Sequence, residues 1–534
     1  MSQIISILKT NFFLICFLSI FFYIPLSSIF YLNLNSGMTN WVELFNNPLF
    51  FRFLTFTISQ SILSIILSSS IGLITGYFLA NSNIPFRSFF RAALTVPFLF
   101  PPLVLLLGFV ILFDSSGILS NLFTNYSFDP FSFNGIIIAH SLYNISLMTR
   151  ILESGFLSEP ESFHQLADSL GVNKWTKFKN ITFPHIKPYF LSAILLVFLY
   201  TFNSFAIVLI LGQVKLQTLE VMIYNQTKLR LNYEFASSLV IIQLLLNLSI
   251  IYLYTKQTSY ETENSALTIK KYTKFNIWPF LFIIFITILT WIPFILLFFS
   301  VIEGLIQAPS IVIDQLFSGD YDRFLGTSSS RVLLNSIIFG IFTSIFTISM
   351  ILALIYSSLQ FNTNKIDRLT SPIILIPMAT SAITISFALI QTHGQFSFFS
   401  DFVSIYILSA HIIAALPFTS RVLFSSFSRV PKEFIIAAKT FGLSNFKIMY
   451  SIIMPLIKSG LLIAFLFSFA ISLGEFGATY YLARGEWTTL SLAIERLFAS
   501  RNTLLPNLYA SLLVIFSLLI FWVIEKFGSV DLRL

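Results

Sequence analysis

The chain has 534 residues, of which 56% are hydrophobic and only 10% are charged, and its mean hydropathy is +0.85. Soluble domains carry about 25% charged residues, so this composition excludes a string of soluble domains and indicates an integral membrane protein. The net charge of +8 comes from basic residues scattered between apolar stretches, without the patch that nucleic-acid binding needs. The single cysteine, Cys16, excludes a disulfide framework and a thiolate metal site.

Twelve stretches are long and apolar enough to cross a bilayer as helices, since a span needs about 20 mostly apolar residues. Six lie in the first half of the chain, at 11–31, 54–80, 93–113, 134–152, 189–212 and 238–255. Six lie in the second half, at 277–302, 332–358, 371–391, 403–424, 459–482 and 507–525. The first stretch is too long for a signal peptide, and no small-residue cleavage site follows it.

With the N-terminus inside, most of the 31 lysines and arginines fall on the cytoplasmic side, as the positive-inside rule requires. We therefore expect a multi-pass protein of the cell membrane with both termini in the cytoplasm. The predicted fold is all-α, with two tandem six-helix units: residues 1–255, a polar cytoplasmic linker at 256–274, and residues 275–534. An even number of spans per half gives both halves the same orientation, so a translocation path between them is expected.

Two predicted cytoplasmic stretches, 160–184 and 431–455, repeat the same residues at an offset of 271. The matching positions are Pro160/Pro431, Phe163/Phe434, Ala167/Ala438, Gly171/Gly442, Ile181/Ile452 and Pro184/Pro455. The register continues from His140/His411 to Ile223/Ile494, so the chain is a duplication. In each loop, proline opens an amphipathic helix, small residues leave room for another surface, and glycine ends the helix. One such loop is equally an ordinary helix–turn–helix, but two in register favour a paired docking surface.

The pattern A-A-x-x-x-G, with proline thirteen residues after the glycine, resembles the EAA loop of binding-protein-dependent ABC importer permeases. This chain departs from it at Gln165 and Ile436, where the family has Glu, and at Leu166, where the family has the first alanine. The resemblance implies a type I importer fold that docks a cytoplasmic ABC ATPase dimer and works with an extracytoplasmic substrate-binding protein. The implied docking residues are Pro160, Phe163, Gln165, Ala167, Gly171, Pro184, Pro431, Phe434, Ala437, Ala438, Gly442 and Pro455.

Several patterns are absent from the sequence. There is no G-x-x-x-x-G-K-[ST] phosphate loop, and no Ser/His/Asp or metalloprotease pattern. We therefore expect a transport subunit without catalytic residues, cofactor or metal site, driven by ATP hydrolysis in a separate partner.

Glu475, flanked by Gly474 and Gly477, lies within the eleventh predicted span. A carboxylate at that depth is costly, so it indicates either the translocation path or a pairing between helices, and both remain open. The glycines allow the helix to break there. The counterpart of Glu475 in the first half is Ser204. His140 and His411 also occupy matching places, and we expect them to hydrogen-bond across helices rather than bind metal.

Prolines and arginines mark further features of the spans. Pro97, Pro101 and Pro102 break the third predicted span, and Pro372 and Pro377 break the ninth. Arg150 and Arg421 lie at the cytoplasmic ends of the fourth and tenth spans, where we expect them to anchor the helix or brace the loop that follows.

A fused pair of six-span units is similar to the permeases of thiamine importers and of ferric-iron importers. The stretches 131–144 and 202–220 resemble the thiamine type, whereas the second half, with Glu475 and 487–490, is as close to the iron type. The resemblance implies thiamine or its phosphates as substrate, with ferric iron second and polyamine, sulfate or molybdate as further alternatives. A secondary transporter driven by an ion gradient and a non-transporting membrane scaffold are the other classes left open.

Overall fold

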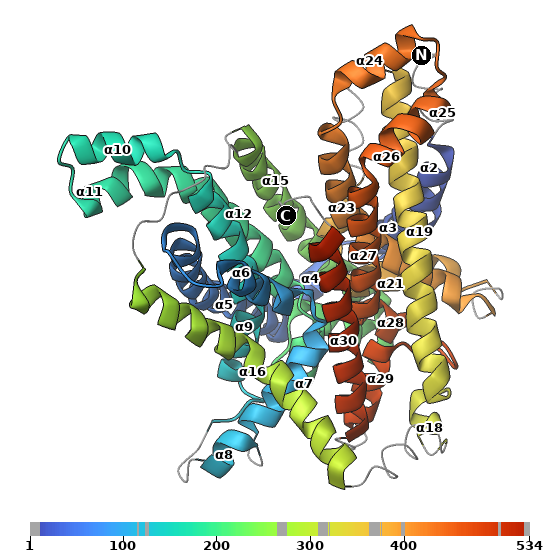
Figure 1. The fold of residues 1–534 in the computed structure, drawn as a ribbon. Helices are drawn as coiled ribbons and strands as arrows, with labels where there is room; N and C mark the ends of the chain where they lie inside the picture. The colour runs from blue at the N-terminus through green and yellow to red at the C-terminus, as the bar shows by residue number, and fades with distance from the viewer. Residues whose placement is uncertain are drawn as a thin grey trace. The chain divides into compact units, whose positions relative to one another are not determined.

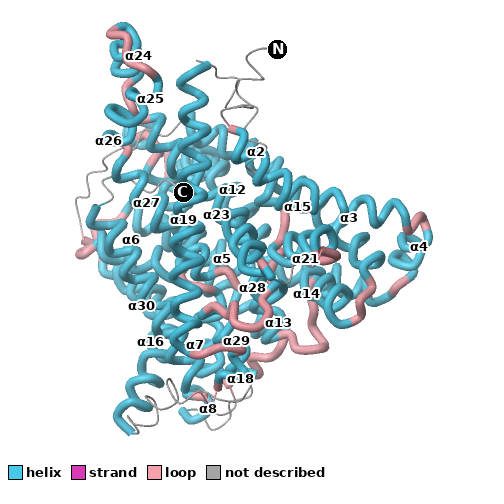
Figure 2. The backbone as a smooth tube through the Cα atoms, turned by 90° about the vertical axis from the view of Figure 1, so that its right-hand side faces the viewer, coloured by secondary structure: helices cyan, strands magenta, loops and turns pink. Residues whose placement is uncertain are grey.

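The computed structural model describes residues 11–114, 117–122, 128–263, 275–307, 319, 321–361, 374, 376–396, 401–499 and 504–527. Within these ranges the chain forms helices and loops, with no β-strand and one isolated bridge between Asn83 and Phe275 (Figure 2). The predicted all-α fold is confirmed. Most of the predicted linker, 264–274, and Pro372 lie outside the described residues.

Ten helices among the described residues are long and apolar enough to cross a membrane. They are Phe12–Asn35, Pro48–Asn81, Pro102–Ser120, Phe133–Leu157, Lys174–Phe202, Tyr233–Gln257, Ile277–Ile306, Asp322–Leu359, Val403–Ser428 and Leu504–Lys526. An eleventh is a pair, Asn445–Leu456 and Lys458–Gly474, bent by 78°. These account for eleven of the twelve predicted spans. The ninth contains the shorter helix Ala382–His393, and its first residues lie outside the described ranges.

The chain divides into two compact units. The smaller unit comprises Phe45–Met222 and Leu245–Ser300. Its helices are α5 (Pro48–Asn81), α6 (Arg87–Thr95), η2 (Val96–Leu99), α7 (Pro102–Phe113), α8 (Ile118–Leu122), α9 (Phe133–Leu157), α10 (Glu161–Ser169), α11 (Lys174–Lys177), η3 (Phe178–Thr182), α12 (Phe183–Phe202), α13 (Ala206–Leu211), the start of α14 (Leu219–Tyr224), and most of α15 (Tyr233–Glu263) and α16 (Ile277–Gln307) (Figure 1).

The larger unit comprises Met1–Leu44, Ile223–Leu244 and Val301–Leu534. It holds α2 (Phe12–Leu18), η1 (Ser19–Tyr23), α3 (Ile24–Asn35), α4 (Thr39–Asn46), η4 (Asn225–Leu229), α18 (Asp322–Leu325), α19 (Ser329–Phe361), η5 (Ile376–Ala379), α21 (Ala382–His393), α23 (Val403–Ser428), α24 (Lys432–Thr440), α25 (Asn445–Ile448), η6 (Met449–Ile453), α26 (Met454–Leu456), α27 (Lys458–Gly474), α28 (Gly477–Leu482), α29 (Leu490–Ala499) and α30 (Leu504–Phe527).

The compact units do not coincide with the two halves of the sequence, because each unit contains the first span of the other half. In the larger unit, the Ser28 and Thr392 hydroxyls lie 2.9 Å apart, which ties α3 to α21. In the smaller unit, the Trp291 indole N–H of α16 donates to the Ala93 carbonyl at 2.7 Å. These exchanged first spans were not anticipated from the sequence.

The duplication extends through the order and bounds of consecutive helices. From α9 and α23 onward, α10, α11, η3 and α13 start and end 271 residues before α24, α25, η6 and α28. A difference appears between α12, which runs on unbroken from η3, and its counterpart, which bends at Ile457 between α26 and α27. The predicted internal repeat is therefore a repeat of structure as well as of sequence.

Small residues bring the helices of each unit close together. A Cβ on Gly72 of α5 would lie 2.5 Å from the Met148 Cβ of α9, and a Cβ on Gly340 of α19 would lie 2.6 Å from the Phe469 ring of α27. Membrane helices gain stability from close backbone approach because lipid supplies no hydrophobic drive between them. The glycines thus allow the close helix packing that positions the loops and broken helices described next.

Candidate functional site

The first repeated loop is a helix–turn–helix with a tightly hydrogen-bonded end. Pro160 is extended, with φ −65° and ψ 124°, and directly precedes α10. After α10, Gly171 adopts a left-handed φ of +67°. Its N–H donates to the Asp168 carbonyl at 3.0 Å, and the Val172 N–H donates to the Ala167 carbonyl at 2.9 Å. This bond pattern is the glycine-terminated helix end that the sequence predicts.

The second loop repeats this geometry. Pro431, with φ −59° and ψ 125°, precedes α24, and Gly442 has a φ of +74°. The Gly442 N–H donates to the Lys439 carbonyl at 3.0 Å, and the Leu443 N–H donates to the Ala438 carbonyl at 3.1 Å. A Cβ on either glycine would meet no atom within 4 Å, so glycine is needed here for its backbone angle rather than for space.

Each loop carries large apolar side chains that the chain leaves exposed. We define the apolar docking face as the equivalent pairs Phe163/Phe434, Leu170/Phe441 and Trp175/Phe446, whose exposed fractions run from 52% for Phe163 to 83% for Phe441. These positions lie outside the helices that could span a membrane, except for Trp175 and Phe446, which lie in the first turn of the following segment. An exposed apolar patch of this kind marks a surface that another molecule covers.

Two of the predicted docking residues do not face outward. Ala167 and Ala438 are 4% and 5% exposed, because the returning chain of each loop hydrogen-bonds back over them. The prediction that these alanines present a small-residue face to a partner is therefore wrong for this conformation. Gln165 and Ala437 are exposed, as are Pro184 and Pro455 in the first turns of α12 and α26.

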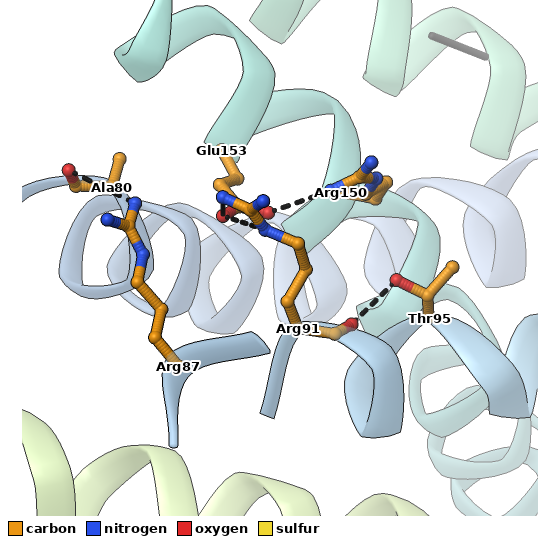
Figure 3. Close-up of polar contacts among 6 residues, drawn as sticks. All are labelled: Ala80, Arg87, Arg91, Thr95, Arg150 and Glu153. Atoms are coloured by element: carbon orange, nitrogen blue, oxygen red, sulfur yellow. Dashed lines mark hydrogen bonds and ion pairs between the residues drawn. The ribbon is translucent and has the colours of Figure 1, made fainter. Parts of the chain in front are cut away.

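A buried carboxylate braces the helix that leads into the first loop (Figure 3). Glu153, near the end of α9, is 1% exposed and receives two arginines. The Arg91 guanidinium of α6 contacts one carboxylate oxygen at 2.7 Å, and Arg150 contacts the other at 3.2 Å. The sequence drew attention to Arg150 alone. The offset of 271 places Phe424 opposite Glu153, so the second repeat has no carboxylate at this position.

The predicted break at Glu475 is present. α27 ends at Gly474, Glu475 is extended with φ −69° and ψ 113°, and α28 begins at Gly477. The Glu475 carboxylate accepts a hydrogen bond from the Ala478 N–H at 2.9 Å, so it caps α28. The counterpart Ser204 likewise lies between two helices, α12 and α13. Both candidate path residues are half-buried.

The two matching histidines hydrogen-bond to these broken segments. The His140 Nε2 lies 2.7 Å from the Ser204 hydroxyl. In the larger unit, His411 contacts the Ser472 hydroxyl at 2.7 Å and the Thr479 hydroxyl at 2.9 Å, on either side of the break. Among the described residues, no group of three His, Cys, Asp or Glu could hold a metal ion. The expectation of cross-helix hydrogen bonds is confirmed.

Comparison with known proteins finds a matching family and several relatives of this chain. Residues 68–258 match the family described as the binding-protein-dependent transport system inner membrane component. The chain is 26% identical over 506 residues to the thiamine transport system permease protein of Haemophilus influenzae, covering 91% of this chain and 90% of that protein.

Two further relatives are similar to this chain over most of its length. The thiamine transport system permease protein of Brucella abortus is 24% identical over 468 residues, covering 85% of this chain and 83% of that protein. An Fe(3+)-transport system permease protein of Haemophilus influenzae is 24% identical over 508 residues, covering 92% and 93%. With its helical fold, its twinned loops and this likeness along nearly the whole length, the chain is similar to the inner-membrane permeases of binding-protein-dependent transport systems.

Proposed function

We propose that this permease forms the translocation path of an ATP-driven importer for thiamine or its phosphates. The observation that carries the proposal is the similarity to thiamine permeases over 91% of the chain, which includes both repeated loops and both broken helices. Ferric iron is the second candidate, since an iron permease is similar over 92% of the chain.

The two loops are the docking sites for a pair of cytoplasmic ABC ATPase subunits. Their shared geometry supports this role, because a dimer of identical subunits needs two equivalent seats. Phe163 and Phe434 begin the apolar docking face in each loop, and the residues predicted from the family pattern surround them. Because Ala167 and Ala438 are buried, they pack inside the docking loops rather than contacting the partner.

The brace around Glu153 connects the first seat to its unit. α9 ends four residues after Glu153 and leads directly into the loop, and Arg91 joins this end of α9 to α6. A movement of the ATPase subunit bound to the first loop is thereby transmitted to both α9 and α6 of the smaller unit.

The proposed path lies along the breaks at Ser204 and Glu475, where helix ends interrupt the spans. Irregular backbone at membrane depth is tolerated where it lines a cavity or is buried in protein. We place residues 1–255 and 275–534 as two permease units joined by the linker 256–274, with both termini and both loops in the cytoplasm. An extracytoplasmic binding protein delivers the substrate to the opposite side of the membrane.

Reconstitution tests the proposal. The purified chain is placed in liposomes with its ATPase, and its binding protein and either labelled thiamine, labelled thiamine phosphate or ferric iron are added on the side opposite the ATPase. We expect uptake of thiamine or its phosphate that needs ATP, the ATPase and the binding protein together. A hydrolysis-deficient ATPase serves as the matched control.

Two results would contradict the proposal in different ways. Uptake of ferric iron with no uptake of either thiamine compound would replace the substrate while leaving the ABC mechanism intact. Uptake that continues unchanged without the ATPase would end the ABC mechanism and favour a transporter driven by an ion gradient.

A further inference from the structure

A group of aromatic and charged side chains in the larger unit has no role in the sites described so far. We define the tyrosine cluster as Tyr224, Lys228, Tyr480, Tyr481 and Glu495. The Tyr224 and Tyr480 rings lie 5.3 Å apart between centroids, and Tyr224 meets Tyr481 edge-on at 6.1 Å. Lys228 places its Nζ 4.5 Å from the centre of the Tyr481 ring. The cluster therefore joins tilted and edge-on tyrosine rings to a cation.

Lys228 is half-buried, and the described residues supply it with no hydrogen bond and no carboxylate within 4 Å. Burial, together with the nearby positive charge of Arg484, lowers the pKa of Lys228 to about 8. An ammonium group held beside another cation and without a counter-ion is destabilised, and a bound anion would relieve that cost. This side of the cluster is suited to an anionic group.

Glu495 has the opposite character. Its carboxylate is half-buried, and no hydrogen bond or ion pair to it occurs within the described part of the chain. Burial raises the pKa of Glu495 to about 7, opposed by the positive charge of Arg496. The Arg496 guanidinium is engaged elsewhere, because it donates to the Leu325 carbonyl at 2.7 Å and to the Thr488 hydroxyl at 2.8 Å. Glu495 is thus an available acceptor beside the tyrosine rings.

The position of the cluster connects it with the repeat. Tyr224 and Glu495 are 271 residues apart, so they occupy equivalent places in the two repeats. Burial raises the pKa of Tyr224, and the charge of Glu495 adds to this rise, so the two equivalent residues interact electrostatically. All five residues of the cluster belong to the larger unit.

Within the larger unit, α29, which carries Glu495, lies toward the end opposite α24 and α25 in both views (Figures 1 and 2). With the loop containing α24 in the cytoplasm, as proposed, α29 lies in the outer half of the unit. A ligand released by a binding protein outside would therefore reach the cluster before it reaches the cytoplasmic end.

We propose that the tyrosine cluster is a binding site for a flat aromatic cation that carries a phosphate. An aromatic ring of such a ligand packs against Tyr224 or Tyr480, its positive charge and amino group face Glu495, and its phosphate approaches Lys228. This inference rests on the proposed function, which it narrows to the phosphate ester of thiamine. A ferric ion fits less well, because the raised pKa of Tyr224 disfavours the phenolate form that would bind the ion.

Binding to the purified chain in nanodiscs tests the inference, using thiamine monophosphate, thiamine and ferric citrate as probes and calorimetry as the readout. We expect the wild-type chain to bind thiamine monophosphate more tightly than thiamine. Lys228→Gln should weaken thiamine monophosphate by at least about tenfold, the loss expected for one charged hydrogen bond, while leaving thiamine unchanged. Glu495→Gln should weaken both thiamine compounds.

Conservative variants separate a binding role from a folding role. Lys228→Arg should restore the preference for the phosphate, and Tyr480→Phe should keep most of the stacking that Tyr480→Ala loses. Tyr252→Ala, at an exposed tyrosine of α15 outside the cluster, is the matched control and should bind like wild type.

The inference is overturned if thiamine monophosphate does not bind the wild-type chain, or if Lys228→Gln affects thiamine as much as its phosphate. Equal binding by wild type, Glu495→Gln and Tyr480→Ala would overturn it as well. ATP-dependent uptake of thiamine in the liposome assay, found together with any of these results, would retain the proposed function and reject the cluster alone.

Discussion

Trp175 offers the sharpest test of the apolar docking face. It lies in α11 with 72% of its surface exposed, and its ring is stacked on Phe178 at 6.0 Å between centroids. No side chain of the loop covers its outer face in this conformation. If an ATPase subunit seats on the loop, the indole passes from water into the interface, and Trp175→Ala should weaken that association.

The size of the effect follows from the exposed area. A tryptophan side chain buries up to about 250 Å², so the exposed 72% of Trp175 is worth roughly 180 Å² if docking covers it fully. At about 25 cal/mol per Å², the upper limit is about 4.5 kcal/mol. Interfaces rarely cover an anchor completely, so about half of this, roughly 2 kcal/mol, is a realistic loss. That corresponds to about a 30-fold rise in Kd.

The assay measures the affinity of the ATPase for the permease in nanodiscs by biolayer interferometry, with thermal unfolding as a check on folding. Trp278→Ala is the matched control, since Trp278 is 75% exposed and belongs to the same compact unit but lies outside the loop. An unchanged Kd for Trp175→Ala, or an equal loss for both variants, would refute the assignment of the apolar face to docking.

Three further predictions concern the loops, the brace and the path. Gly171→Glu together with Gly442→Glu should abolish co-purification of the ATPase while membrane insertion persists. Each change forces an L-residue into a left-handed backbone conformation, at a cost of about 1–2 kcal/mol, and adds a charge to the docking loop. Recovery of the ATPase at wild-type levels would contradict this prediction. Glu153→Ala should lower the midpoint temperature of thermal unfolding of the purified chain, because it leaves two arginines without their carboxylate. The loss of stability should be smaller than the about 3–5 kcal/mol of breaking a fully buried ion pair, since both arginines are partly exposed. An unchanged midpoint would show that these ion pairs are dispensable for stability. Glu475→Gln should impair uptake more than ATPase binding, since a glutamine oxygen can still cap α28 while the charge is lost; normal uptake would leave Glu475 with a capping role only.

The loops could be predicted because everything that shapes them is local. Pro160 and Gly171 act within one helix and its turn, and the same residue types recur 271 positions later in the second half. The break at Glu475 was also predictable, since two glycines and a carboxylate in an apolar run cannot continue a helix at low cost. Such features depend on residues a few positions apart.

Features that depend on distant contacts could not be predicted. Arg91 and Glu153 are 62 residues apart, and nothing in either stretch indicates that the other is its partner. The burial of Ala167 results from the path of the chain after Gly171, which the pattern of small residues does not specify. The ring contact between Tyr224 and Tyr480 joins residues far apart in the sequence, so it exists only once the helices have packed.

The exchange of first spans has a consequence for synthesis. Phe12–Asn35 packs in a unit that otherwise comprises Ile223–Leu244 and Val301–Leu534, and the buried Asn33 amide donates to the hydroxyls of Ser237 and Ser238. At about 5–20 residues per second, the ribosome needs on the order of tens of seconds to complete that unit after the first span has emerged. The partners of Asn33 emerge well before that, but Thr392, whose hydroxyl contacts Ser28 of the first span, emerges only in the second half of the chain. A chain that stops in the linker would keep the Asn33 contacts but leave the first span without α21, so such a fragment would not be half of a working permease.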